Sequence, residues 1–259
     1  MDLSNDNMIH IKDGEVEYLQ FKKLLEYNDI LCHCYTLKGL NNDYNKNDGT
    51  NYKKLCASLK IDEESVRKIN HQAHSDKVEK VNSKEEIFSD IDGMFTNKKN
   101  IYLSLNFADC TPILFFSPKE KVVGNIHSGW RGTVQKIGQK GAIKIIKEYD
   151  INPNNLLCFI GPCINKCHFE VGEDVKEIFE NTFSYLLNKE EFIKKVEQKQ
   201  DKYLIDTNII NRKLLEEIGI PKNNIIESNI CTVCNKEYMH SYRAEREKAG
   251  RNTAIIGLK

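Results

Sequence analysis

The chain has 259 residues, of which 40% are hydrophobic and 29% are charged, a composition typical of a soluble globular protein. Its 38 basic side chains balance 38 acidic ones, which argues against a basic nucleic-acid-binding surface. Because the first residues are polar and no apolar run approaches the ~18 residues of a membrane span, we expect a cytoplasmic protein without a signal peptide or membrane segment.

The first half of the chain is predicted to be rich in strands. A loop dense in Asn, Asp and Gly is expected at residues 39–51. Short apolar runs separated by turn residues follow it and are typical of buried strands. These expected strands cover residues 66–73, 101–107, 112–116 and 122–126.

Helices and strands are mixed in the second half. Apolar residues at near-helical spacing predict a helix over 133–149, and further helices are expected at 172–187 and 207–218. The polar stretch 188–202 is interpreted as an exposed helix or an insertion. Strands are expected at 156–160 and 252–258. This order of elements favours a single domain of mixed α/β type over residues 1–259.

Nine cysteines in a large, apparently cytosolic chain indicate reduced thiols or metal ligands rather than a disulfide framework. A CxxC motif lies at residues 231–234. A structural zinc needs four ligands, and the nearest further candidates are His240 and the group Cys163, Cys167 and His168. The sequence alone favours two unpaired thiols on a turn over a second metal.

A first set of candidate site residues comprises His74, Cys110 and His127, each of which closes or follows an expected strand. Strand ends meet at the rim of a sheet, so residues distant in sequence can converge there. Two imidazoles and a thiolate suit Zn²⁺, and three protein ligands leave one position open, which is the catalytic pattern. Spacing alone also allows two core histidines and a buried free cysteine, and both interpretations stay open.

A second set flanks a Gly-Trp-Arg-Gly turn at residues 129–132, which precedes an expected helix. The planar guanidinium of Arg131 and the helix start would seat an anion, whereas the alternative is a structural turn with Trp130 packed on the sheet. Near the C-terminus, Tyr242 and Arg243 either line a pocket or belong to a solvated charged face.

Several motifs occur here in one order: QAHSDKV, DGMFTN, ADCTPILFF, HSGWRGTVQKI, IGPCINKCHFEVG and SYR followed by GR. Together they resemble the YfiH/DUF152 family, also called laccase-domain or multicopper polyphenol oxidase proteins. The resemblance covers about residues 31–259 and implies a single domain with a mixed β-sheet flanked by helices.

The resemblance also implies an activity. Members of this family are understood as zinc-dependent enzymes that phosphorolyse adenosine, inosine, guanosine and methylthioadenosine and also deaminate adenosine. The expected ligands and partners are therefore zinc, purine nucleosides and phosphate. The motif positions of the family's metal ligands are occupied here by His74, Cys110 and His127.

One segment departs from the family pattern. Where members commonly carry an arginine and two glycines, this chain has Lys38, Gly39 and Leu40, so a bidentate contact is replaced by a point charge. We expect Arg131 with the helix start, or Lys38, to bind phosphate. Asp109 is expected either to hold a ligand histidine or move a proton, or simply to cap a turn.

Three other functions remain as alternatives. In a cysteine hydrolase, Cys110 would be the nucleophile and His127 its base. A copper-dependent phenol oxidase would need a trinuclear cluster with many histidines, and the chain has seven histidines in all, so copper is less favoured than zinc. A non-enzymatic binding module would use a zinc site structurally. The sequence leaves the oligomeric state open.

Overall fold

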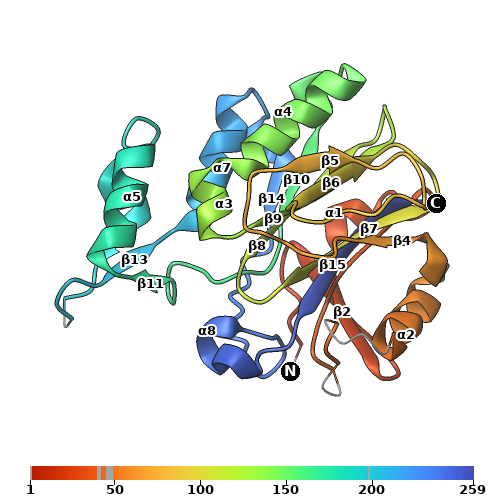
Figure 1. The fold of residues 1–259 in the computed structure, drawn as a ribbon, viewed down its shortest axis with the longest axis horizontal. Coiled ribbons are helices and arrows are strands. Elements are labelled where there is room, and N and C mark those ends of the chain that lie inside the picture. The colour runs from red at the N-terminus through yellow and green to blue at the C-terminus, as the bar shows by residue number, and fades with distance from the viewer. Residues whose placement is uncertain (1, 40–41, 45–48, 198) are drawn as a thin grey trace.

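A computed structural model describes residues 2–39, 42–44, 49–197 and 199–259, in which two β-sheets pack face to face between helices (Figure 1). The first sheet has the strand order β1 (Met8–Asp13), β2 (Val16–Phe21), β3 (Leu31–Thr36), β15 (Asn252–Leu258), β7 (Ile101–Phe107) and β4 (Val66–Lys68). The second has the order β14 (Ile225–Glu227), β10 (Leu157–Ile160), β8 (Thr111–Ser117), β9 (Val122–Ser128), β6 (Gly93–Thr96) and β5 (Val78–Lys80).

Helices and a small sheet complete the described structure. The small sheet has the order β11 (Glu170–Val171), β13 (Tyr203–Ile205) and β12 (Ile193–Lys195). The helices are α1 (Lys22–Leu25), α2 (Thr50–Leu59), α3 (Trp130–Val134), α4 (Ile137–Tyr149), α5 (Glu173–Phe183), α6 (Lys189–Phe192), α7 (Thr207–Glu217) and α8 (Tyr242–Glu245). Within the described part of the chain, none of these helices has the length and hydrophobicity needed to cross a bilayer.

The main core lies between the two large sheets. In β8, Leu114 and Phe116 face the first sheet, whereas the alternate residues Ile113 and Phe115 pack with α4 and α7 on the other side. Burial on both faces explains why the strands of this sheet are continuous apolar runs in the sequence. Figure 1 shows α4 and α7 covering the outer face of this sheet, and α2 beside the first sheet.

The last strand of the chain lies inside the first sheet. β15 pairs antiparallel with β3 on one side and with β7 on the other. All seven of its residues are buried, and Asn125 of β9 donates a hydrogen bond to the Ala254 carbonyl across the sheet interface. The two large sheets are therefore joined through the C-terminal strand.

The predicted mixed α/β fold is confirmed, and several element boundaries match closely. Strands 101–107 and 252–258 form as expected, and the strand and helices predicted at 156–160, 172–187 and 207–218 form with slightly shorter bounds. The expected helix over 133–149 is instead divided, because Lys136 adopts a left-handed conformation with φ of 61° between α3 and α4.

Two other expectations were wrong in extent. The strand predicted at 66–73 ends at Lys68, and the chain then continues as the loop that carries His74. The stretch 188–202 contains both α6 and the strand β12, so it is not a single exposed helix. Part of the loop predicted at 39–51, including Leu40, lies outside the described residues.

Candidate metal centre and active site

Neighbouring strand ends of the second sheet carry the candidate site. Cys110 directly precedes β8, His127 is near the end of β9, and Asp92 directly precedes β6. The antiparallel registers place Pro112 opposite His127 and Gly93 opposite Ile126, so these ends adjoin. The His127 amide donates to the Asp92 carbonyl at 2.7 Å, which extends the β6–β9 pairing into the site.

His74 reaches the same point from the loop between β4 and β5. Its Nε2 lies 3.8 Å from Cys110 Sγ, and its ring is edge-on to the ring of His127 with centroids 4.9 Å apart. One ligand atom from each of these three residues lies within 4.8 Å of the others. The structure thus brings together the three residues that the sequence nominated, and the donor set of two nitrogens and one sulfur suits a zinc-like cation.

A carboxylate absent from the candidates chosen in the sequence holds this group in place. Asp92 is fully buried, and its Oδ1 accepts hydrogen bonds from His127 Nδ1 at 2.8 Å and from the His74 amide at 3.1 Å. Its Oδ2 accepts from the amide and hydroxyl of Ser75 at 2.6 and 2.8 Å. Burial alone would raise the pKa of Asp92, but these hydrogen bonds lower it below its usual value.

The contact with Asp92 also determines which nitrogen of His127 is available. Because Nδ1 is bonded to the carboxylate, Nε2 is the ring nitrogen left for a metal ion. In the sequence, Asp92 is the first residue of the DGMFTN motif and stands directly before a short apolar strand, as Asp109 and Cys110 stand before β8.

Gly129 provides room for the ligands. A Cβ atom at this position would lie 2.8 Å from His74 Cδ2 and 3.1 Å from Cys110 Sγ. Any larger residue would displace one of the two side chains. The site is therefore a cradle that the backbone keeps open, and its residues fit a bound metal ion.

Without a metal, the buried thiol and imidazole of this site interact strongly. Burial alone would raise the pKa of Cys110, but the charge of His127 and hydrogen bonding to both histidines lower it to about 6. Burial would likewise lower the pKa of His127, but Cys110 and the hydrogen bond to Asp92 raise it to about 9. In the metal-free protein, each group therefore favours the charged form of the other, a thiolate beside an imidazolium.

A pocket of about 790 Å³ opens in front of His74, Cys110 and His127. This volume is in the range of small-molecule binding sites. Its wall combines aromatic and basic side chains from distant segments. These residues are Trp130, Arg131, Phe169, Tyr242, Arg243, Arg246 and Arg251. The wall therefore offers both flat apolar surfaces and positive charge.

Arg131, Tyr242 and Arg243 thus line the pocket. The Arg131 guanidinium lies 4.3 Å from the Trp130 ring centroid, and Arg243 donates to the His168 carbonyl at 2.8 Å. Tyr242 is 50% exposed. The helix that follows the Gly-Trp-Arg-Gly turn has only five residues, so its dipole is small and the positive charge comes from side chains.

Asp109 lines the pocket, where its expected role in moving a proton stays a prediction, but it does not hold a ligand histidine. Asp109 accepts hydrogen bonds from the Thr232 hydroxyl and the Arg243 amide at 2.6 Å each, and the carboxylate that holds the ligand histidine is Asp92 instead. Lys38 is paired with Glu245 at 2.5 Å and lies outside the residues that line the pocket. Its charge is therefore already engaged away from the metal centre.

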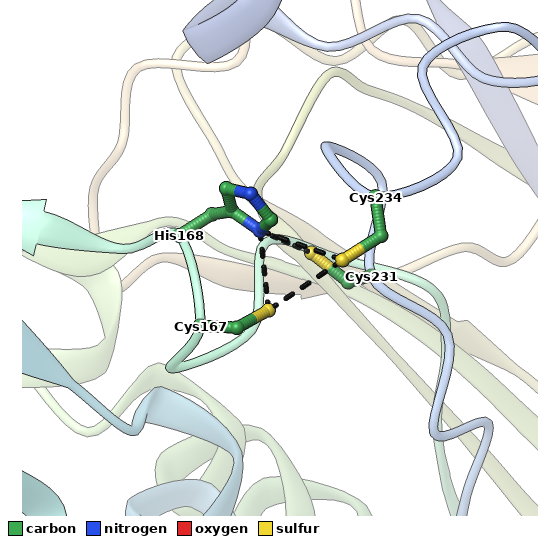
Figure 2. A group of neighbouring side chains, drawn as sticks. All are labelled: Cys167, His168, Cys231 and Cys234. Atoms are coloured by element: carbon green, nitrogen blue, oxygen red, sulfur yellow. Dashed lines mark hydrogen bonds between the residues drawn. The ribbon is translucent and has the colours of Figure 1, made fainter.

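The CxxC motif does not stand alone either. The structure brings Cys231 and Cys234 together with Cys167 and His168 (Figure 2). The side chains of the other two candidates are not part of this group: Cys163 Sγ contacts Asn208 at 3.1 Å, and His240 bonds to the Asn42 carbonyl. Both thiols are unpaired and lie at a turn, as expected, but they are not isolated from other potential metal ligands.

Comparison with known proteins gives one consistent family. Residues 36–259 match the family described as multi-copper polyphenol oxidoreductase laccase. A Bacillus subtilis protein named purine nucleoside phosphorylase YlmD is 29% identical over 197 residues, which cover 73% of this chain and 69% of the relative. A purine nucleoside phosphorylase of Staphylococcus saprophyticus is 34% identical over 195 residues, which cover 72% of this chain and 71% of that protein.

Solved structures resemble the whole described fold. The crystal structure of Bacillus licheniformis hypothetical protein YfiH has a TM-score of 0.84 at 26% identity and covers 96% of this chain and 99% of its own. YlmD from Geobacillus stearothermophilus has a TM-score of 0.83 at 24% identity, covering 97% and 99%. The overall fold of this chain is thus one that has been observed in crystal structures.

Proposed function

This chain belongs to the laccase-like YfiH family, and on that premise we propose that it is a zinc-dependent purine nucleoside phosphorylase. The observation that carries the proposal is the open group of two imidazoles and a thiol at the base of a pocket with an arginine-rich wall. The names of the relatives from Bacillus and Staphylococcus support the same reaction.

His74, Cys110 and His127 would hold the zinc ion, with Asp92 orienting His127. Zinc bound by three protein ligands supplies Lewis-acid polarisation at its open position. Copper chemistry of the multicopper type has less support, because the chain's seven histidines are too few for the clusters that it uses.

In phosphorolysis, a phosphate oxygen bonds to the anomeric carbon of the ribose while the bond from that carbon to the purine nitrogen breaks. The products are the free base, which takes up a proton, and ribose 1-phosphate. We assign phosphate binding to Arg131 and Arg243, whose guanidinium groups suit bidentate contact with phosphate oxygens. Trp130 and Phe169 provide flat surfaces against which a purine can pack.

The proposed substrates are adenosine, inosine, guanosine and methylthioadenosine, with deamination of adenosine as a second activity of the same site. All nine cysteines are free thiols, which supports a reducing, cytoplasmic setting. A panel of these nucleosides incubated with and without phosphate, with products identified by mass, tests the proposal. We expect base and ribose 1-phosphate (5-methylthioribose 1-phosphate from methylthioadenosine) only with phosphate, and inosine from adenosine without it.

Two variants make this test specific to the site. Cys110→Ala is expected to lose both turnover and the zinc bound at this centre, whereas Cys56→Ala, in the distant helix α2, is expected to keep both. Full phosphorolysis by a Cys110→Ala protein without zinc at this centre would exclude the metal mechanism.

A cysteine hydrolase is a second candidate, and the thiolate–imidazolium pair of Cys110 and His127 favours it. Alkylation with iodoacetamide separates the two functions. A nucleophile is alkylated in the metal-free protein and protected by substrate, whereas a zinc ligand is protected by zinc alone.

A further inference from the structure

We propose that Cys167, His168, Cys231 and Cys234 form a second, structural zinc site. Cys167 and His168 are neighbours in the loop between β10 and β11, and the two other residues belong to the CxxC turn that follows β14. Their four ligand atoms lie within 4.8 Å of one another, and Figure 2 shows the side chains converging from the two loops.

Four of the six distances between these atoms match the edges of a zinc tetrahedron, and the other two are within 4.8 Å. Cys167 Sγ lies 3.7 Å from Cys234 Sγ, and His168 Nδ1 lies 3.2, 3.7 and 3.5 Å from the sulfurs of Cys167, Cys231 and Cys234. Usual zinc–ligand bond lengths leave two sulfurs about 3.8 Å apart and a sulfur and a nitrogen about 3.5 Å apart in a tetrahedral site. The group therefore surrounds a space of the size that zinc needs.

The donor set is that of a structural site. Three thiolates and one imidazole provide four protein ligands, which closes the coordination sphere and leaves no position for substrate. This composition differs from the open set of His74, Cys110 and His127. The separation of 3.7 Å between the sulfurs of Cys167 and Cys234 is also far longer than a disulfide bond of about 2.05 Å.

The backbone holds both loops in position for such a site. The Cys163 amide donates to the Ile230 carbonyl, and the Thr232 amide donates to the Cys163 carbonyl, which forms a short parallel bridge beside the cluster. The turn after Cys231 is closed by Asn235, whose amide and side chain both donate to the Cys231 carbonyl. The ligands are thus preorganised from segments more than 60 residues apart in sequence.

The position of the cluster suggests what the metal stabilises. The His168 carbonyl accepts a hydrogen bond from Arg243, and the next residue, Phe169, lines the pocket. On the other loop, Thr232 donates to Asp109, which precedes Cys110. A zinc ion here would fix one loop that lines the pocket and a second loop that holds Asp109 of the pocket wall, without contacting the substrate.

Metal analysis of the purified, reduced protein by mass spectrometry tests this inference independently of catalysis. We expect two zinc ions per chain in the wild type and one in Cys234→Ser. Cys110→Ala should also retain one, and the double variant should retain none. Cys163→Ser is the matched control, because it removes a nearby thiol outside the cluster, and it should keep two. Failure of the proposed function would not change the zinc retained by Cys110→Ala.

X-ray absorption at the zinc edge covers the case in which Cys234→Ser does not fold. The zinc retained by Cys110→Ala should show three sulfur ligands at about 2.3 Å and one nitrogen at about 2.0 Å. The proposal is overturned if Cys110→Ala binds no zinc. A disulfide between Cys167 and Cys234, detected by thiol counting in the denatured, unreduced protein, would overturn it equally.

Discussion

Replacing Asp92 with asparagine is expected to weaken zinc binding at the candidate active site. The carboxylate accepts four hydrogen bonds, two from the histidine side of the site and two from Ser75. An amide has one acceptor oxygen, so its NH₂ group must face donors on one of these sides. If it faces His127, the proton moves to Nε2, which then no longer binds a metal.

The expected magnitude follows from the number and kind of these contacts. Loss of a partner that orients a ligand histidine typically costs about 10–100-fold in metal affinity, which is about 1.4–2.7 kcal/mol. A lost hydrogen bond to a buried charged group costs about 1.5–3 kcal/mol. We therefore expect the metal-free Asp92→Asn protein to be destabilised by about that amount as well.

Competition with a chromophoric chelator measures the affinity, in a Cys234→Ser background so that the second cluster does not contribute. Asp90→Asn is the matched control, because Asp90 is two residues away and exposed, and it bonds to His71. We expect its zinc affinity to equal that of the parent. If Asp92→Asn bound zinc within threefold of the parent, Asp92 would not be the group that orients His127.

Three further predictions concern pH, the metal cradle and packing. His33 is buried and accepts the Phe21 amide, and burial lowers its pKa from 6.5 to about 3. Its contribution to the free energy of unfolding is therefore complete above pH 6.5 and declines at lower pH, by about 1.4 kcal/mol per pH unit down to pH 3. Denaturant titrations at several pH values should show this as a steeper loss of stability with falling pH in the wild type than in His33→Asn. Gly129→Ala should reduce zinc affinity by roughly 10–100-fold by displacing His74, measured by chelator competition, and an unchanged affinity would mean that the ligand shifts without cost. Gly141→Ala should lower the free energy of unfolding by about 1–3 kcal/mol, as measured by chemical denaturation, because its Cβ would overlap the Ile126 side chain. A variant as stable as the wild type would mean that the Ile126 side chain rotates away.

The parts of the fold that could be predicted are those in which burial shows directly in the sequence. The apolar runs at 101–107 and 252–258 are strands with both faces covered, so side chains on either face are in a similar, buried environment. β1, at Met8–Asp13, was not predicted, because its residues are mostly half-exposed and its pattern is weak. The break at Lys136 was hidden for another reason, since lysine carries no preference for a left-handed backbone.

The candidate site also contains residues that the sequence could identify and residues that it could not. His74, Cys110 and His127 were identifiable because each stands in a motif shared with a known family. Asp92 stands in such a motif too, DGMFTN, but its role could not be assigned from the residues alone, since its donors come from segments 17 and 35 residues away. The partners of the CxxC thiols are more than 60 residues distant, and only the folded chain shows that they meet.

The central position of β15 has a consequence for how this protein is made. Neither β3 nor β7 has a partner on its inner side until residues 252–258 have been synthesised, so both present open backbone edges during translation. Contacts between segments more than 200 residues apart also slow folding, because the chain must close a long loop before they form. We therefore expect nascent chains that lack this strand to be aggregation-prone and to depend on chaperones.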